Sequence, residues 1–294
     1  MSLNLAQRQR LTGAGLSAPP VVYLLIFFLA PSLLLLLYSF WTAGDFTVTP
    51  VFTMESYARA LRADAFYQAT WTGFKNGFWT ALVCVVTAFP VAYYIVYRAK
   101  TNFIFYAVLL SWFSSYLVRV YAWRTILGTN GVINSTLMNL GVIDEPLRFL
   151  LFSPLATTIT LIHIMFPFAL LLLVSALRDI KRDYLDAARD LGATSVQMLT
   201  RVILPMSHKG LVGAFMFTFI LSAGDYITPQ LLGGGEGVTS GLLIANQFRS
   251  AGNWPLGAAM AFLLLCVFAL SYVLFVGFLR MCRVSPGRRY HAEL

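Results

Sequence analysis

Six long apolar runs constrain this chain more than any other feature of its sequence. Each run is close to the roughly 20 residues that a helix needs to cross the hydrocarbon core of a membrane. The runs are Pro20–Phe40, Gly73–Tyr97, Phe103–Leu127, Pro154–Leu177, Gly210–Leu231 and Leu256–Leu279. Only 11% of the residues are charged, whereas a soluble domain carries about a quarter. The chain is therefore predicted to be an all-α integral membrane protein with about six transmembrane helices.

The basic residues are distributed unevenly between the segments that connect these runs. Most of the 21 Lys and Arg residues precede the first run, follow the second and sixth, or lie between the fourth and fifth. The other connections hold only Arg59, Arg62, Arg148 and Arg249. Because cytoplasmic loops are enriched in Lys and Arg, both termini are predicted to be cytoplasmic. The net charge of +9 is then a signal of topology rather than of nucleic-acid binding.

The apolar runs also define the domain organisation. Residues 20–280 are expected to form one transmembrane domain, between cytoplasmic tails at residues 1–19 and 281–294. Residues 178–209 form a charged cytoplasmic loop inside that domain. The first run is too long for a cleavable signal peptide, and no small-x-small site follows it.

The sequence offers no recognisable catalytic, nucleotide or metal site. The glycine cluster Gly233–Gly237, expected to be flexible, lacks the Lys-Ser/Thr pair that ends a phosphate-binding loop. Cys84, Cys266 and Cys282 have neither metal-ligand nor disulfide spacing. His163 is expected to be a packed, hydrogen-bonded histidine. An enzyme would need nucleophilic, acidic or metal-binding groups that converge, so a transport subunit is favoured.

The cytoplasmic loop carries a compact motif of one acid, several small residues and a Leu-Pro pair. Its members are Asp186, Ala187, Ala188, Gly192, Ala193, Leu204 and Pro205. Small side chains allow another surface to approach the backbone closely, and Gly192 tolerates the positive φ of a sharp turn. Pro205 is expected to set the bend at which the loop enters the fifth run, because its φ is fixed and it lacks an N–H. Two short helices are predicted for the loop.

This motif resembles the Glu-Ala-Ala loop of ABC importer permeases, with Asp186 for the usual Glu and Val202 where Ile is common. The resemblance implies a MetI-like type I ABC importer permease in the bacterial inner membrane. Its loop would dock in a groove of an ATPase subunit, and Asp186 would accept hydrogen bonds from the loop or from that partner.

The same resemblance implies the other subunits of the transporter. They are a second homologous permease, a dimer of ATP-binding subunits and a periplasmic substrate-binding protein. ATP and Mg are then expected on the partner ATPase, with no cofactor on this chain. A transporter driven by an ion gradient is the less favoured alternative, because the chain lacks paired acids within its apolar runs.

Three further blocks resemble spermidine/putrescine permeases in the expected order. They are Val118–Asn134, Gly224–Gly234 and Asn253–Ala259. The similarity covers about residues 20–280 and implies a polyamine cargo. An importer of opines, amino-acid derivatives or other small organic ions is the alternative.

Asp225 is the only carboxylate inside a predicted span. Ionisable residues at membrane depth are costly and usually face a cavity or a partner. A cationic amine would gain from this acid and from the aromatic faces of Tyr226, Tyr121 or Trp123. These residues are therefore candidates for the translocation path.

Two arginines of the third run leave the role of Asp225 open. Arg119 or Arg124 could pair with Asp225 as a purely structural contact. If the arginines instead face the pathway, an anionic or zwitterionic substrate is favoured. Arg119 is therefore included among the candidate pathway residues.

Overall fold

The computed structural model describes residues 18–44 and 47–281, which divide into two compact units. The first unit contains the described residues up to Ala63 together with Ile244–Leu263. The second contains Asp64–Leu243 and the described residues from Leu264 onward. The predicted tails, residues 1–19 and 281–294, fall almost entirely outside the described residues, and so does Cys282.

The first unit begins with the helix Ala18–Tyr38, which contains η1 (Leu25–Leu29) and α2 (Ala30–Tyr38). A short antiparallel hairpin of β1 (Thr42–Ala43) and β2 (Val48–Thr49) and then α3 (Glu55–Arg62) follow. The rings of Phe40 and Phe52 stack with centroids 5.0 Å apart, and the hydroxyls of Ser39 and Tyr57 are 2.8 Å apart. The connection after the first predicted span is therefore a folded segment.

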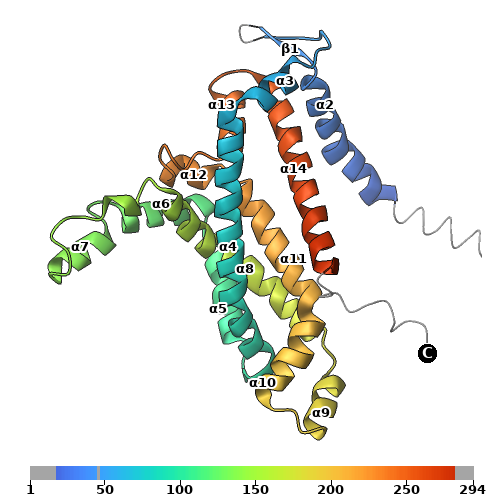
Figure 1. The fold of residues 1–294 in the computed structure, drawn as a ribbon, viewed down its shortest axis with the longest axis vertical. Coiled ribbons are helices and arrows are strands. Elements are labelled where there is room, and N and C mark those ends of the chain that lie inside the picture. Colours follow the sequence, from blue (N-terminus) through green and yellow to red (C-terminus); the bar gives the residue numbers. More distant parts are fainter. Residues whose placement is uncertain (1–17, 45–46, 282–294) are drawn as a thin grey trace, which may run out of the picture. The chain divides into compact units, whose positions relative to one another are not determined.

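The second unit is built around three packed helices, α4 (Asp64–Tyr97), α8 (Pro154–Arg178) and α11 (Leu204–Ala223) (Figure 1). Small residues line the buried stripe of α4, namely Ala81, Cys84, Ala88 and Ala92. Such residues let membrane helices approach closely. At Gly77 a Cβ would come within 2.8 Å of the Ala223 Cβ, so this contact between α4 and α11 requires a glycine.

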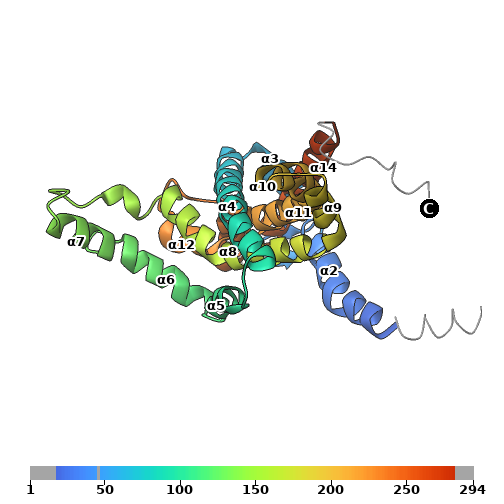
Figure 2. The ribbon, with the colours of Figure 1, turned by 90° about the horizontal axis from the view of Figure 1, so that it is seen from below.

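The third apolar run is not one straight span. It forms α5 (Phe103–Trp112) and α6 (Tyr116–Leu127), and α7 (Val132–Asn139) follows. The helical segments Phe103–Trp112 and Tyr116–Asn139 are bent by 92°, and α6 and α7 project from the three packed helices (Figures 1 and 2). Ser115 has an extended ψ of 141° and starts the new helix. Hydropathy alone could not reveal this break, because the run is apolar on both sides of it.

The fifth run also differs from its predicted bounds. One helix runs from Ser195 to Ala223 and comprises α10 (Ser195–Met198), η3 (Leu199–Ile203) and α11. It ends before α12 (Ile227–Leu232), so the predicted span Gly210–Leu231 starts too late and ends too late. The physical reason for its end is the break at Gly224, the residue that caps α11.

Pro205 lies within this continuous helix, so it does not mark the predicted bend between the loop and the span. Proline lacks an N–H, and its ring clashes with the carbonyl four residues earlier. The π-helical turn η3 ends at Ile203, two residues before Pro205, and widens the helix there. The same pairing occurs in the first unit, where η1 precedes Pro31.

The remaining predicted spans each coincide with one helix, although the second starts earlier than predicted, at Asp64 instead of Gly73. The described residues contain five helices long and apolar enough to cross a membrane, or six if the bent pair counts as one. The five helices are Ala18–Tyr38, Asp64–Tyr97, Pro154–Arg178, Ser195–Ala223 and Trp254–Leu279. The last lies within α14 (Trp254–Met281). The predicted all-α membrane fold is therefore confirmed.

The glycine cluster after α12 is a packed turn rather than a loose linker. Gly234 has a φ of +62°, and a Cβ there would lie 2.3 Å from the Phe152 carbonyl oxygen. The Ser153 N–H also donates to the Leu232 carbonyl at 2.9 Å. α13 (Ser240–Arg249) begins after this turn.

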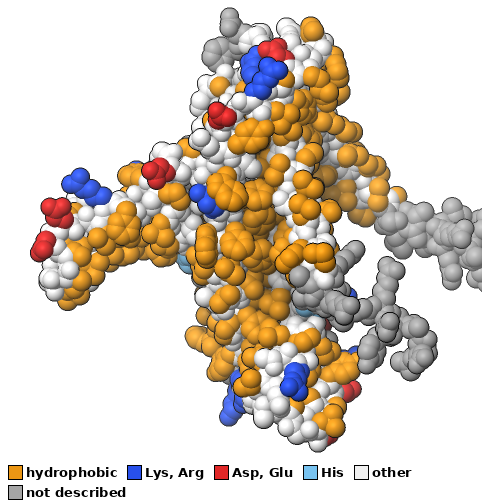
Figure 3. Space-filling model, in the orientation of Figure 1, with side chains coloured by type: hydrophobic (Ala, Val, Ile, Leu, Met, Phe, Trp, Pro, Cys, Tyr) orange, Lys and Arg blue, Asp and Glu red, His pale blue; other side chains and the backbone are white. Residues whose placement is uncertain are grey.

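Figure 3 shows how side chains of each kind are distributed over the second unit. Charged side chains gather around α9 (Arg182–Asp190) and α10, and again beyond α7. Hydrophobic side chains dominate the surface in between. This pattern is typical of a membrane-embedded helical bundle with polar loops at its ends.

Candidate functional site

The predicted loop motif lies at the charged end of the second unit, on α9 and the turn that follows it. Leu185 is the buried residue of α9, and Ala188 packs in part against the same core. Asp186 and Ala187 are exposed. The helix is therefore anchored by one apolar position and presents its acid and its small residue to the surroundings.

The end of α9 forms a Schellman motif around Gly192. The Ala193 N–H donates to the Ala188 carbonyl at 3.0 Å, and the Gly192 N–H donates to the Arg189 carbonyl at 2.8 Å. Gly192 has a φ of +78°, the left-handed conformation that this motif requires. Gly192 thus makes the sharp turn that its tolerance of a positive φ permits.

The surface around this turn is unusually apolar for a charged loop. Apart from its two chain neighbours, no described residue has an atom within 4 Å of a Cβ placed on Gly192, and the preceding Leu191 is 89% exposed. Tyr184 and Val196 are also exposed. Burying a leucine side chain releases about 1.5–3 kcal/mol, so Leu191 has the chemistry of a docking contact.

Asp186 has a partner inside the loop itself. The Arg189 guanidinium donates to its carboxylate at 2.7 Å, one turn along the exposed face of α9. The following α10 starts with a capping box, in which Thr194 and Gln197 bond each other's backbone N–H groups. Leu204 is half-buried and Pro205 is exposed, one helical segment further on.

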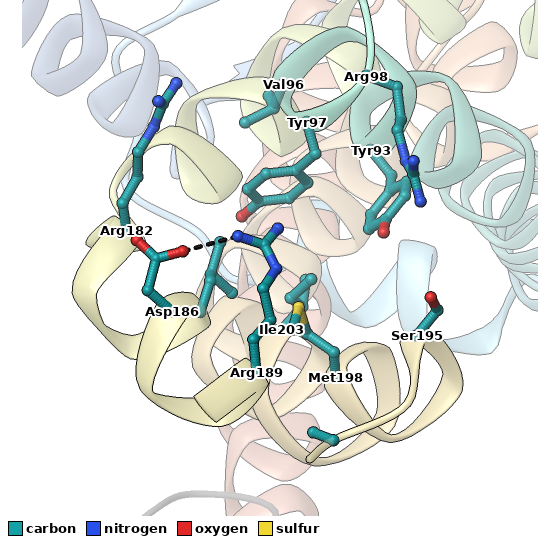
Figure 4. A pocket seen from close by; sticks show the side chains of 12 residues that line it. Tyr93, Val96, Tyr97, Arg98, Arg182, Asp186, Arg189, Ser195, Met198 and Ile203 are labelled. Carbon is teal, nitrogen blue, oxygen red and sulfur yellow. Dashed lines mark hydrogen bonds and ion pairs between the residues drawn. The ribbon is translucent and has the colours of Figure 1, made fainter. Parts of the chain in front are cut away.

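A cavity of about 440 Å³ lies between the end of α4, α9 and α10 (Figure 4). Three arginines and two tyrosines line it, together with Asp186 and several apolar residues. The predicted loop residues Asp186 and Ala193 are part of its wall. The loop therefore encloses a polar space as well as presenting an apolar surface.

Asp225 lies in the break between α11 and α12 rather than inside a helix. Its carboxylate accepts hydrogen bonds from the Tyr116 hydroxyl at 2.8 Å and from the Thr228 N–H at 2.9 Å. The Thr239 hydroxyl donates to the Asp225 carbonyl at 3.0 Å. The acid thus caps the start of α12 and ties it to the start of α6.

The structural pairing of Asp225 with an arginine is not observed. Among the described residues no ion pair joins Asp225 to Arg119 or Arg124. Arg124 lies over the Phe152 ring, 5.7 Å from its centroid. Arg119 is only 7% exposed, and its Nε has no hydrogen-bond partner in the described part of the chain.

The other predicted pathway residues, Trp123, Tyr121 and Tyr226, differ in their burial and in their partners. Trp123 is half-buried and donates from its indole nitrogen to His163 Nδ1 at 2.9 Å, which confirms a hydrogen-bonded histidine, although His163 is exposed. Tyr121 is 51% exposed and Tyr226 is 37% exposed. Within the described residues, no hydrogen bond joins either tyrosine to Asp225. The aromatic residue that bonds Asp225 is Tyr116.

Two residues of the candidate sites did not emerge from the sequence. Tyr116 shares a helical face with Arg119 and Trp123 at spacings of three and four residues, and this periodicity places Tyr121 on the opposite face. That signal was available in the sequence. Leu191 adjoins the motif, but its exposure follows only from the orientation of α9 and its terminal turn.

Comparison with solved structures shows which known proteins share this fold. The bacterial alginate ABC transporter in complex with an alginate pentasaccharide-bound periplasmic protein matches with a TM-score of 0.74 at 19% identity, over 95% of this chain and 97% of that one. An inward-facing MetNI methionine ABC transporter matches with a TM-score of 0.56 at 19% identity, over 75% and 96%. Both likenesses concern the fold alone.

Curated proteins are similar over nearly the whole chain. The spermidine/putrescine transport system permease protein PotB of Escherichia coli (strain K12) is 30% identical over 259 residues, which cover 87% of this chain and 93% of that protein. The inner membrane ABC transporter permease protein YdcU of the same organism is 32% identical over 274 residues, covering 87% and 86%. The putrescine transport system permease protein PotI of that organism is 28% identical, covering 89% of both chains.

The family model described as binding-protein-dependent transport system inner membrane component matches residues 102–281. This range includes the bent α5–α6 pair, α8, the loop motif and the Asp225 break. The chain therefore belongs to the family of binding-protein-dependent transport system inner membrane components, and is an inner-membrane permease subunit of an ABC importer.

Proposed function

We propose that this permease carries polyamines such as spermidine and putrescine into the bacterial cell. The proposal is supported by the relatives named as spermidine/putrescine and putrescine permeases, which are 28–31% identical over most of this chain. The chain works with a second homologous permease, a dimer of ATP-binding subunits and a periplasmic substrate-binding protein. ATP and Mg bind to the ATP-binding subunits.

The coupling of ATP hydrolysis to transport takes place at the loop motif. The observation that carries this assignment is the exposed turn at the end of α9, where Leu191 is 89% exposed and Gly192 is open to close approach. Asp186 is held by Arg189, which leaves the second carboxylate oxygen for a donor on the ATPase. An apolar contact at Leu191 beside a short polar contact at Asp186 would form a tight interface, which can transmit rigid-body motion from the ATPase to the permease.

The loop side of the membrane is the cytoplasmic side. The support is the concentration of Lys and Arg between α8 and α11, which the connections on the other side lack. The ATPase, a cytoplasmic subunit, then meets α9 directly.

The cargo passes the break that contains Asp225. Broken helices at membrane depth occur where backbone lines a cavity or packs against protein, and here two breaks, before α6 and before α12, meet at the Tyr116–Asp225 hydrogen bond. The Asp225 carboxylate, held by the Tyr116 hydroxyl and the Thr228 N–H, is the acidic group that a cationic amine would meet at this break.

A second candidate cargo is a small anionic or zwitterionic solute. Arg119 favours it, because this arginine is buried beside Tyr116 on the same helix face and its Nε has no partner within the described residues. A carboxylate on the cargo would supply that partner.

Uptake by the complete four-component transporter in proteoliposomes distinguishes the two cargo classes. Radiolabelled spermidine and putrescine are expected to accumulate in an ATP-dependent manner in the presence of the binding protein. Excess unlabelled polyamine should compete, whereas amino-acid and opine carboxylates should not. Accumulation of a carboxylate with no polyamine uptake would exclude the polyamine assignment and favour the second candidate.

A further inference from the structure

The cavity enclosed by α4, α9 and α10 has a strongly basic lining. Arg98, Arg182 and Arg189 line it, and Asp186 is the acid among the lining residues. Figure 4 shows Arg98 descending from the end of α4 beside Tyr93, and Arg189 pointing up toward Tyr97. The volume is about 440 Å³, enough to hold a compact anionic group.

Two of the three guanidinium groups have no acidic partner among the residues that the structure describes. Arg189 is bonded to Asp186 at 2.7 Å. The side chains of Arg98 and Arg182 make no ion pair or hydrogen bond with another residue in the described ranges. The lining therefore holds one carboxylate and three guanidinium groups, which is an excess of two positive charges.

The position of the cavity indicates which class of ligand would bind there. Tyr93 and Tyr97 lie in the last turns of a membrane-spanning helix, where tyrosine is enriched at the membrane–water boundary. Basic pockets between membrane helices on the cytoplasmic side bind anionic headgroups, and the guanidinium fork matches phosphate oxygens with two parallel hydrogen bonds. The apolar residues Val96 and Met198 line the same cavity.

We propose that this cavity is a binding site for a phosphate-bearing anion, with Arg98 and Arg182 as its main ligands. The source of the phosphate is either the headgroup of an acidic phospholipid or a free phosphate compound. The inference rests on the proposed cytoplasmic position of the loop, and on neither the cargo nor the docking of an ATPase. Occupancy would brace α9 against α4, because the two arginines come from these two elements.

The test uses the purified full-length chain in detergent, titrated with phosphatidylglycerol or phosphatidylcholine and followed by native mass spectrometry. A parallel arm adds inorganic phosphate and follows the thermal unfolding midpoint. The variant Arg98→Gln/Arg182→Gln removes both unpaired charges, and Arg98→Lys/Arg182→Lys keeps them. The matched control is Arg201→Gln, an exposed arginine of η3 outside the cavity lining.

Phosphatidylglycerol should bind equally well to the wild-type chain and to Arg201→Gln. It should bind about 30-fold more weakly to the double Gln variant, because each basic residue near an anionic surface strengthens binding by about fivefold. The double Lys variant should recover part of that loss. Phosphatidylcholine should not discriminate between variants. This result identifies a lipid headgroup as the source.

A rise in the unfolding midpoint with inorganic phosphate, lost in the double Gln variant alone, would support the same site with a free phosphate compound as ligand. The proposal is overturned if neither anion distinguishes the double Gln variant from Arg201→Gln. It is also overturned if the double variant binds phosphatidylglycerol normally but no longer captures the ATPase, because the cavity would then belong to the subunit interface. Transport of polyamines plays no part in either readout, so a wrong cargo assignment would not produce these results.

Discussion

At the scale of single residues, Asp225 is both a structural and a charged group. Its two carboxylate oxygens accept from the Tyr116 hydroxyl and from the Thr228 N–H. Removing the side chain would eliminate the cap of α12, and the loss of such a cap typically lowers stability by about 1 kcal/mol. Removing only the charge would test what the carboxylate does for the cargo.

The variant Asp225→Asn separates these two roles. Its amide oxygen can still accept from the Thr228 N–H, and its NH₂ group can donate to the Tyr116 oxygen while that hydroxyl turns to Thr228 Oγ1, 2.8 Å away. The complex should therefore assemble normally, whereas spermidine uptake should fall at least tenfold. Size-exclusion chromatography and initial uptake rates measure the two effects.

Tyr116→Phe serves as the matched control for Asp225→Asn, because it removes a hydrogen bond to Asp225 but keeps the carboxylate. It should reduce uptake much less. Loss of assembly in Asp225→Asn, or equal effects of the two variants on uptake, would assign Asp225 a structural role only.

The residues differ in how far the sequence could predict them. Gly192 was predictable, because a glycine after a short charged helix commonly takes a positive φ. Tyr116 could have been found from helical spacing once α6 was known to start there. The burial of Arg119 and the exposure of Leu191 could not be predicted, since both depend on how whole helices pack.

At the scale of elements, the bundle was easier to predict than its irregularities. The lengths of the helix Ala18–Tyr38, of α8 and of α14 follow from apolar patterning. The 92° bend after α5 and the end of α11 at Ala223 do not. Both breaks are short interruptions of long apolar runs, at Ser114–Ser115 and Gly224–Asp225, and hydropathy averaged over a whole span does not resolve them.

The short helix α10 provides a prediction at this scale. Thr194→Ala removes the hydroxyl that accepts the Gln197 N–H at 3.3 Å. Loss of such a cap costs about 1 kcal/mol, so amides at the start of α10 should exchange with solvent about fivefold faster. Hydrogen-exchange mass spectrometry of the loop peptides measures this change.

Thr200→Ala is the control for the cap variant. Its hydroxyl bonds the Val196 carbonyl inside the helix and satisfies no terminal N–H group. Exchange at α10 should stay at the wild-type rate. If both variants accelerate exchange equally, the capping box does not hold this helix.

At the scale of the whole molecule, the charge distribution predicts which loops lie on which side of the membrane. Leu191 and Val142 are both exposed, in the loop after α9 and in the connection after α7. A single cysteine at either position, in a chain without its three native cysteines, provides a probe. In intact spheroplasts a membrane-impermeant maleimide should label Val142→Cys and spare Leu191→Cys.

Inside-out vesicles should reverse this pattern of labelling. Labelling of Leu191→Cys from outside the cell would contradict the proposed topology. It would also remove the physical basis for an ATPase contact at α9.

The central claim is that the turn at Gly192 joins this permease to its ATPase, and one pair of variants tests it most directly. Gly192 and Gly141 both have a positive φ, +78° and +66°. Beyond the adjacent residues, no atom in the described part of the chain lies within 4 Å of a Cβ at either position. Gly192→Val and Gly141→Val therefore add similar backbone strain, about 1–2 kcal/mol, at opposite loops.

The measurement is spermidine uptake and ATP hydrolysis in the same proteoliposomes of the complete transporter. In Gly192→Val the ratio of spermidine uptake to ATP hydrolysis should fall at least tenfold, or the variant should fail to retain the ATPase. The reason is that a branched side chain strains the turn and blocks the close approach of the ATPase. Gly141→Val should keep the wild-type ratio and the wild-type subunit composition. A wild-type ratio in Gly192→Val, or equal losses in the two variants, would contradict the account.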